Sequence, residues 1–285
     1  MSYSPRNIDR SRNAITIKFP GLFSLLTSVV SVGLIVSCWG FIFAESQGKA
    51  PLISGETSAR AELIFGQLFG SETWSFTGSR VREIGRLVAD TLAMSVISAA
   101  MAVITVFVLL PVAARTNTEG SSRFIRIPLY LTARGLFIFT RAVPELMWAL
   151  VVVFVLSPGI FAGAVALAIH NFGVIGRLGA DTVEDAEQAP LVALRISGAS
   201  EAQSYLSGVL PLIARQLLTF LFYRWEVIIR TTAVVGFVAA SGIGYQLRID
   251  MNLFRYPEVG QLLIAYVLIV CAVDLTSTLV RRAFK

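Results

Sequence analysis

The sequence has few charged side chains for its length. Only 15% of its 285 residues are charged, whereas 55% are hydrophobic. A soluble fold of this composition would leave far more apolar surface than one core can bury. The composition therefore excludes an ordinary soluble domain and predicts an integral membrane protein.

Histidine and cysteine are scarce, and several catalytic motifs are missing. The chain has one histidine, His170, and two distant cysteines, Cys38 and Cys271, without CxxC spacing. These residues define neither a disulfide framework nor a metal site. The sequence also lacks a glycine-rich Walker loop, a Ser/His/Asp set and paired carboxylates with acid–base spacing. We expect no catalytic, cofactor or metal site here, and any ATP hydrolysis must belong to another chain.

The net charge of +6 does not indicate a nucleic-acid partner. The basic residues are spread over the tail and the loops, with no basic stripe that is interleaved with aromatic residues. Membrane proteins accumulate Lys and Arg in cytoplasmic loops for insertion reasons alone. We therefore attribute the positive charge to membrane insertion.

Long apolar runs are the main feature that is present. A helix needs about 20 mainly apolar residues to span a bilayer. Only helices satisfy all of their backbone hydrogen bonds within one open-ended segment, so we predict an all-α membrane fold. Six segments qualify: Leu22–Ala44, Leu87–Ala113, Pro128–Leu156, Ile160–Ile175, Leu212–Ala240 and Val259–Val280. The first exceeds the about 7 to 15 apolar residues of a cleaved signal, which favours a membrane anchor.

Charge asymmetry predicts the orientation. Lys and Arg in the tail, after the second and fourth spans and at the end of the chain outnumber those in the other loops. Both termini are therefore expected in the cytoplasm. The predicted organisation is a cytoplasmic tail (1–21) and a transmembrane domain (22–285), with a periplasmic loop (45–86) and a cytoplasmic loop (181–211). A short amphipathic helix is expected near Ala59–Phe69.

A polar stretch, "GASEAQSYLSGVLP" from Gly198 to Pro211, interrupts the apolar sequence. Pro190 suits the first turn of a helix, and Gly198 suits its C-terminal end. Ser200 and Gln203 have the spacing of a reciprocal capping box that starts a second helix, and Pro211 suits the first turn of the next segment. The pattern predicts two short helices that meet at a glycine elbow on the cytoplasmic face.

This spacing resembles the "EAA...G.........I.LP" motif of permease subunits in bacterial ABC importers, which docks in a groove of the ATPase subunit. "ALRISGAS" and "SGVLP" are similar to phosphonate-type permeases in particular. So are "DTLAMSV", "RAVPELMWAL", "ALAIHNFGVIGRL" and "YRWEVIIRTTAVVGFVAASGIGYQL", which follow the family's order over Leu87–Leu247. The resemblance implies the fold of a type I importer permease in a bacterial inner membrane.

The motif departs from the family at several positions. Val192 stands at the glutamate place, Ala193 and Leu194 at the alanine places, and Gly208 at the isoleucine place. Loss of the glutamate removes a charged contact of the kind that affects association rate and salt dependence. The residues that the resemblance assigns to ATPase coupling are Pro190, Val192, Ala193, Leu194, Gly198, Ala199, Ser200, Leu210 and Pro211.

Charged and hydroxyl side chains at membrane depth suggest a substrate pathway or gate. A charge at a helix centre costs about 2.5 to 3.5 kcal/mol on insertion scales. Glu226 and Arg230 have the spacing of an ion pair along one helix, so two interpretations stay open: a pair that only locks helices, or an arginine that attracts an oxyanion. The candidate pathway residues are Pro144, Glu145, Arg224, Glu226, Arg230, Thr231 and Thr232.

The resemblance implies a permease that imports phosphonate, phosphite or hypophosphite. The implied partners are ATPase subunits that hold ATP and Mg²⁺, a periplasmic binding protein and a second permease copy or close relative. Two alternatives stay open: an importer permease for another solute such as methionine, and a non-transporting scaffold or regulatory subunit. A membrane enzyme is disfavoured because the catalytic sets are missing.

Overall fold

The computed structural model describes residues 22–46, 55–114, 123–187, 189–239 and 241–283 of the chain. All regular elements in these ranges are helices, as predicted. The structure divides into two compact units, with the boundary between Glu62 and Leu63. The N-terminal tail (1–21) lies outside the described residues.

The first unit holds α1 (Leu22–Ser46), which is long and apolar enough over Leu25–Ala44 to cross a membrane. At 1.5 Å per residue, about 20 residues match a hydrocarbon layer of about 30 Å. The helix coincides with the anchor predicted over Leu22–Ala44.

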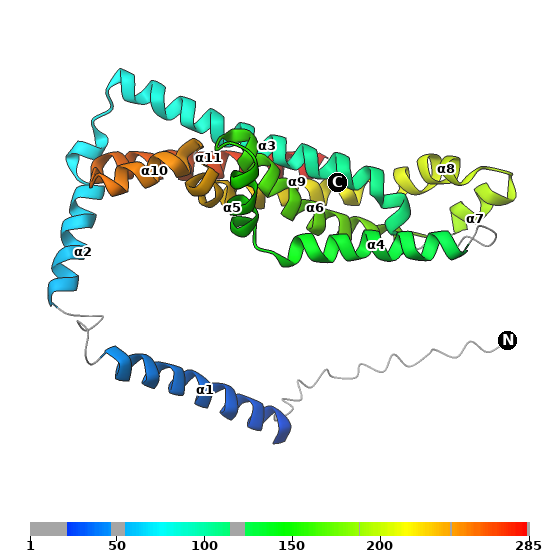
Figure 1. Cartoon of the computed structure of the whole chain (residues 1–285), viewed down its shortest axis with the longest axis horizontal. Coiled ribbons are helices and arrows are strands. Elements are labelled where there is room, and N and C mark those ends of the chain that lie inside the picture. Colours follow the sequence, from blue (N-terminus) through cyan, green and yellow to red (C-terminus); the bar gives the residue numbers. More distant parts are fainter. Residues whose placement is uncertain (1–21, 47–54, 115–122, 188, 240, 284–285) are drawn as a thin grey trace, which may run out of the picture. The chain divides into compact units, whose positions relative to one another are not determined.

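The second unit holds the remaining spans, whose arrangement is shown in Figure 1. Its principal helices are α3 (Gly78–Ala113), α4 (Arg123–Ala142), α5 (Glu145–Val155), α6 (Ile160–Glu184), α9 (Leu210–Ala239), α10 (Gly242–Asn252) and α11 (Tyr256–Ala283). The other elements are α2 (Gly55–Leu68), which includes residues on both sides of the boundary, η1 (Ser71–Trp74), α7 (Ala189–Ile196), α8 (Glu201–Ser204) and a π turn, η2 (Tyr205–Val209). In the described residues, five helices are long and apolar enough to span a membrane, or six if α4 and α5 count as one bent span.

Two predicted span boundaries were wrong. The segment Pro128–Leu156 is interrupted at Pro144, as expected for proline, and α4 and α5 meet there at an angle of 97°. Pro144 causes this break, because proline disfavours helical geometry at the residue before it and lacks an N–H to donate. The second span begins at Gly78 rather than Leu87, and α6 continues to Glu184 rather than ending at Ile175. The charged residues at the start of α3 and at the end of α6 are typical of loop sequence. A helix also accepts such residues where their spacing lets them form ion pairs.

The region 45–86 is less irregular than a loop. It contains α2, η1 and the first turns of α3. The helix expected near Ala59–Phe69 is present as α2. Residues 47–54 of the region 45–86 lie outside the described ranges.

The centre of the second unit is α6, which contacts α3, α4, α5 and α9. Its buried face consists largely of alanine and glycine. A Cβ atom at Gly163 would collide with Met94, and one at Gly176 would collide with the ring of Phe137. Small residues of this kind let membrane helices approach closely. Phe137 and Met94 are themselves fully buried, so the neighbouring helices fill the space that the glycines leave.

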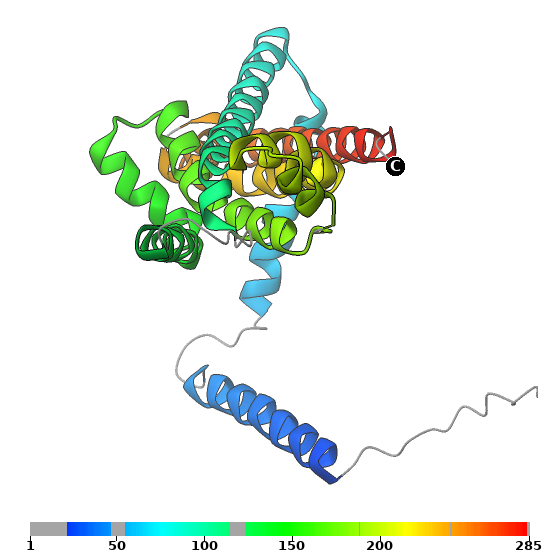
Figure 2. The ribbon, with the colours of Figure 1, turned by 90° about the vertical axis from the view of Figure 1, so that its right-hand side faces the viewer.

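The second unit has two ends with different contents. At one end the last turns of α3 and α6 lie near α7, α8 and the start of α9; we call it the elbow end, and it faces the viewer in Figure 2. At the other end α10 lies beside the first turns of α3 and α11; we call it the hub end. The placement of the elbow end in the cytoplasm stays a prediction.

The close contact between α4 and α6 can be tested by adding one methyl group. A Cβ atom at Gly173 would lie 2.6 Å from the carbonyl oxygen of Phe137 and closer still to Thr140 Oγ1. We expect Gly173→Ala to destabilise the protein by about 1–3 kcal/mol, measured as a lower midpoint of thermal unfolding in detergent. Gly135→Ala is the control, because nothing lies within 4 Å of its added Cβ. Equal midpoints for the two variants would contradict close packing at Gly173.

Candidate functional site

The elbow predicted at Gly198 is present at the end of α7. Pro190 lies in the first turn of this helix, and Gly198 adopts a positive φ of 85°. Ala199 N–H donates to Leu194 O at 3.1 Å, which closes the end of α7 in the manner of a Schellman motif. Glycine is favoured here because left-handed backbone carries no penalty from a Cβ atom.

The predicted capping box follows directly. Gln203 N–H donates to Ser200 Oγ at 3.3 Å, and Ser200 N–H donates to the Gln203 side-chain oxygen at 2.9 Å. This reciprocal pair starts α8. The next five residues form the π turn η2, in which Leu210 N–H donates to Tyr205 O, and α9 begins at Leu210. Pro211 lies in the first turn of α9 as predicted, but the chain passes through the π turn into this helix without a break.

The elbow presents an apolar surface above a buried base. Ile196 is 82% exposed, Val192 is 50% exposed and Leu206 is 56% exposed. Pro190, Ala193, Gly198 and Ser200 are also exposed, whereas Leu194, Ala199 and Leu210 are half-buried. Beneath them Val209 and Ile213 are buried in a cluster with residues of α3 and α6. The elbow therefore joins directly to the core of the second unit.

An arginine ties three helices together at the base of the elbow. Arg134, on α4, is only 8% exposed. Its Nε donates to Ala113 O at 2.9 Å, and its terminal nitrogens bind Asp181 and Glu184, each at 2.6 Å. These contacts connect the last turn of α3 and the last turns of α6 to α4, just before the chain enters the elbow. The sequence signal was the i,i+3 spacing of Asp181 and Glu184, two carboxylates on one helix face.

A second polar group lies at the bend between α4 and α5. His170, on α6, contacts both sides of the bend: Nδ1 lies 3.0 Å from Val143 O, and Nε2 lies 3.2 Å from Glu145 Oε2. A carbonyl oxygen only accepts, so Nδ1 donates to Val143 O. Trp148 Nε1 adds a bond of 3.0 Å to Thr140 O across the bend. Pro144 therefore causes the bend, and contacts from His170 on α6 hold it in place.

Arg224, on α9, extends this polar group. Its Nε donates to Asn171 Oδ1 at 2.6 Å, and Asn171 Nδ2 donates to Leu167 O on its own helix. Glu145 attracts the Arg224 guanidinium electrostatically. The terminal nitrogens of Arg224 form no ion pair or hydrogen bond with another described residue, and they keep accessible surface. The cluster of Glu145, His170, Asn171 and Arg224 therefore contains a guanidinium whose outer edge is available to a ligand.

Glu226 and Arg230 belong to a different network. Glu226 is buried and accepts from Arg230 at 2.8 Å and from Arg281 at 3.2 Å. Tyr266 Oη, on α11, donates to Arg230 O at 2.8 Å. The network joins α9 to α11, which favours the helix-locking interpretation of this pair.

The two threonines after Arg230 bond to their own helix. Thr231 Oγ1 and Thr232 Oγ1 both donate to Ile228 O, at 3.1 and 2.6 Å. Their hydroxyl groups are therefore satisfied without a ligand. Among the predicted pathway residues, Glu145 and Arg224 belong to the polar cluster at the bend beside Pro144. Glu226 and Arg230 belong to a separate hydrogen-bond network, and Thr231 and Thr232 bond to their own helix. His170 and Asn171 were not among the predicted pathway residues, and their contacts link segments that are far apart in the sequence.

An α-helical membrane bundle with an exposed helical elbow at one end has the architecture of a transporter permease. Residues 120–285 match the family of binding-protein-dependent transport system inner membrane components, and the chain belongs to this family. It is therefore an inner membrane transport component, and such components in general work with an ATPase and a substrate-binding protein.

Individual relatives agree with this assignment. The phosphite transport system permease protein PtxC of Stutzerimonas stutzeri is 35% identical over 70% of this chain and 70% of its own length. The phosphate-import permease protein PhnE of Mycolicibacterium smegmatis is 30% identical over 70% of this chain and 36% of its own length. These matches confirm the resemblance that the sequence motifs indicate.

The fold also matches solved structures. A structure of the MetNI methionine ABC transporter, determined in inward-facing conformations, superposes with a TM-score of 0.61. It covers 74% of this chain and 100% of its own, at 19% identity, and this likeness concerns the fold alone. The prediction of a type I importer permease fold is confirmed.

Proposed function

We propose that this chain is the permease of an ATP-driven importer for phosphorus oxyanions, a class that includes phosphonate, phosphite, hypophosphite and phosphate. One observation carries the substrate class: relatives named for phosphite and for phosphate transport align with 70% of the chain. Both names specify small anions in which oxygen atoms surround phosphorus.

Arg224 provides a physical basis for anion passage. A cation at membrane depth is costly unless it is paired, hydrated or used. Arg224 donates from Nε to Asn171, and its two terminal nitrogens form no hydrogen bond with another described residue. The guanidinium edge matches the spacing of two oxygens in an oxyanion, and its charge-assisted bonds are stronger than neutral ones. Glu145 nearby would weaken the attraction, which suits a site that must release its anion rather than retain it.

The elbow provides a contact for the ATPase. We propose that the elbow lies in the cytoplasm, where the partner ATPases would bind ATP and Mg²⁺. These subunits would contact the exposed surface around Val192, Ile196 and Gly198. A periplasmic binding protein would deliver the anion at the opposite end, and a second permease copy or close relative would complete the pathway. ATP shifts the conformations only if the partner binds the two states with different affinity.

The alternatives have weaker support. The likeness to the methionine transporter is one of fold, at 19% identity, and it does not favour methionine as the solute. A non-transporting scaffold was suggested by Val192. An apolar side chain there still offers a contact surface, because Val192 and Ile196 are both exposed.

The substrate class is tested with the complex reconstituted in lipid together with its binding protein. We expect phosphite, phosphonate, hypophosphite or phosphate to stimulate ATP hydrolysis, because loaded binding protein favours the transport-competent state. Methionine should have no effect. A response to methionine without one to any phosphorus oxyanion would refute the proposed substrate class.

The role of Arg224 is tested by neutralising it. Losing one charge-assisted contact of about 1.5–3 kcal/mol should lower anion uptake by Arg224→Gln roughly 10- to 100-fold at subsaturating substrate. Arg230→Gln is the matched control on the same helix, since Arg230 pairs with Glu226 and Arg281 still compensates that carboxylate. Uptake is measured in proteoliposomes at equal amounts of assembled complex. Equal losses in the two variants would rule out a special role for Arg224.

The role of the elbow is tested at Gly198. A β-branched side chain in left-handed backbone costs about 1–2 kcal/mol or more, so Gly198→Val should weaken copurification with the ATPase and reduce stimulated ATP hydrolysis. Gly198→Asn is the control, because asparagine tolerates this backbone. The space around the added Cβ is open, so the strain arises from the backbone alone. If Gly198→Val leaves both uptake and ATPase association unchanged, the elbow is not a coupling element.

A further inference from the structure

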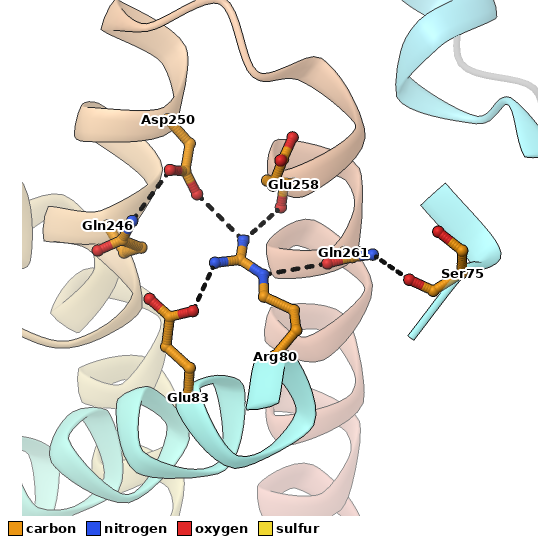
Figure 3. Close-up of polar contacts among 7 residues, drawn as sticks. All are labelled: Ser75, Arg80, Glu83, Gln246, Asp250, Glu258 and Gln261. Carbon is orange, nitrogen blue, oxygen red and sulfur yellow. Dashed lines mark hydrogen bonds and ion pairs between the residues drawn. The ribbon is translucent and has the colours of Figure 1, made fainter. Parts of the chain in front are cut away.

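The hub end is organised by one arginine, Arg80, in the first turn of α3 (Figure 3). Its terminal nitrogens bind Glu83 at 2.9 Å and Asp250 at 3.1 Å. The nitrogen that binds Asp250 also lies 3.3 Å from Glu258 O, and Nε lies 3.1 Å from the Gln261 side-chain oxygen. We call these residues the Arg80 hub. They join α3 to α10 and to the first turns of α11.

The hub extends to its neighbours through amide side chains. Gln246 donates to the second oxygen of Asp250 at 2.9 Å, and Gln261 donates to Ser75 O at 3.2 Å. Asp250 is fully buried, whereas the side chain of Glu83 is 46% exposed and lies on the same helix as Arg80. At this end of α10 the ion pair that reaches α3 is therefore Arg80–Asp250, whereas Glu83 lies on the same helix as Arg80.

The other end of α10 is fixed by close packing. Gly242 has a φ of 69°, and a Cβ atom there would lie 2.6 Å from Thr91 Oγ1. Ile243 N–H donates to that same hydroxyl oxygen at 3.0 Å. A Cβ atom at Gly244 would collide with Ala233 O, so α10 folds tightly against the end of α9. Thus α10 begins in close contact with α9 and α3, Leu247 in its middle packs against a hydrophobic cluster, and Asp250 near its other end is held by polar contacts.

Arg80 borders a hollow, whereas its partner Asp250 is buried. The hollow has a volume of about 680 Å³, and the residues that line it include Glu72, Arg80, Glu83 and Glu258. Charged groups separate most readily where water can solvate them on release, because the desolvation penalty is then regained. The guanidinium of Arg80 therefore has polar space beside it into which it can move when it leaves Asp250.

From this geometry we infer that Arg80 is a positioning residue that latches α10 against α3, and that opening of the hub end requires this latch to release. The inference rests on the proposed function only in that the elbow contacts an ATPase. Since α9 begins at the elbow and carries α10 at its other end, the latch would oppose movement driven from the elbow. Release of the latch should then favour ATP hydrolysis without a stimulus.

The test is the basal ATP hydrolysis of the assembled complex in lipid, without binding protein or substrate. Arg80→Gln and Asp250→Asn should each raise the basal rate roughly threefold to tenfold, as the unlatched population grows. Arg80→Lys keeps the positive charge but lacks the planar guanidinium, so its basal rate should lie between those of the native protein and Arg80→Gln. Glu83→Gln is the matched control and should leave the rate unchanged. A structural defect would lower the basal rate, so an increase distinguishes release of a latch from damage to the fold. If Arg80→Gln and Asp250→Asn both have the same basal rate as Glu83→Gln, the latch is overturned.

A reversible cross-link provides a second measurement that does not depend on the charge variants. Arg80→Cys and Asp250→Cys are combined in a chain whose Cys38 and Cys271 are replaced by serine, and a bifunctional methanethiosulfonate is added. Cross-linked complex should lose its basal and stimulated activity, and reductant should restore both. Full stimulated activity in the cross-linked state would overturn the latch. Because the basal assay contains no substrate, an incorrect substrate class would leave the basal rates in both experiments unaffected.

Discussion

The close approach of helices to α6 is the constraint on which the second unit depends. Lipid provides no hydrophobic force that drives helices together, so association relies on packing and on interhelical polar contacts. Alanine and glycine on the buried face of α6 allow α3, α4, α5 and α9 to pack around it. Phe137 illustrates the result, since its ring is fully buried against Gly176 and packs edge-on with Phe172 at 5.0 Å. The polar sites lie between helices whose spacing this packing sets.

The charged side chains divide according to how completely the protein satisfies them. Arg134 has three acceptors, Arg80 has four, and Glu226 has two arginines. Buried charges with such partners fix the relative position of helices, since removing one partner leaves the other uncompensated. Arg224 differs, because its one hydrogen bond to a described residue uses Nε and leaves the outer edge of the guanidinium available. On our proposal, this contrast, rather than charge alone, distinguishes the anion site at Arg224 from structural ion pairs.

Local sequence rules predicted local structure well. The elbow at Gly198, the capping box of Ser200 and Gln203 and the break at Pro144 all follow from backbone chemistry within a few residues. Contacts between distant segments could not be obtained this way. Arg80 and Asp250 are 170 positions apart, and Arg224 and Asn171 are 53 apart, so neither pair leaves a spacing signal. The extension of α6 to Glu184 was missed for a related reason, because Asp181 and Glu184 appear as loop charges until Arg134 is known to bind them.

The two ends of the second unit are joined by rigid connections, and this bears on how movement at one end reaches the other. Arg134 fixes the ends of α3 and α6 beneath the elbow, and α9 runs from the π turn to its close contact with α10. The junction around Gly244 is closely packed, because the Ala233 carbonyl leaves no space there even for a Cβ atom. A displacement of α9 must therefore be relieved where α10 is held by exchangeable contacts. The Arg80 hub, bordered by a polar hollow, is such a place, and on our proposal it is where the conformations of this permease diverge.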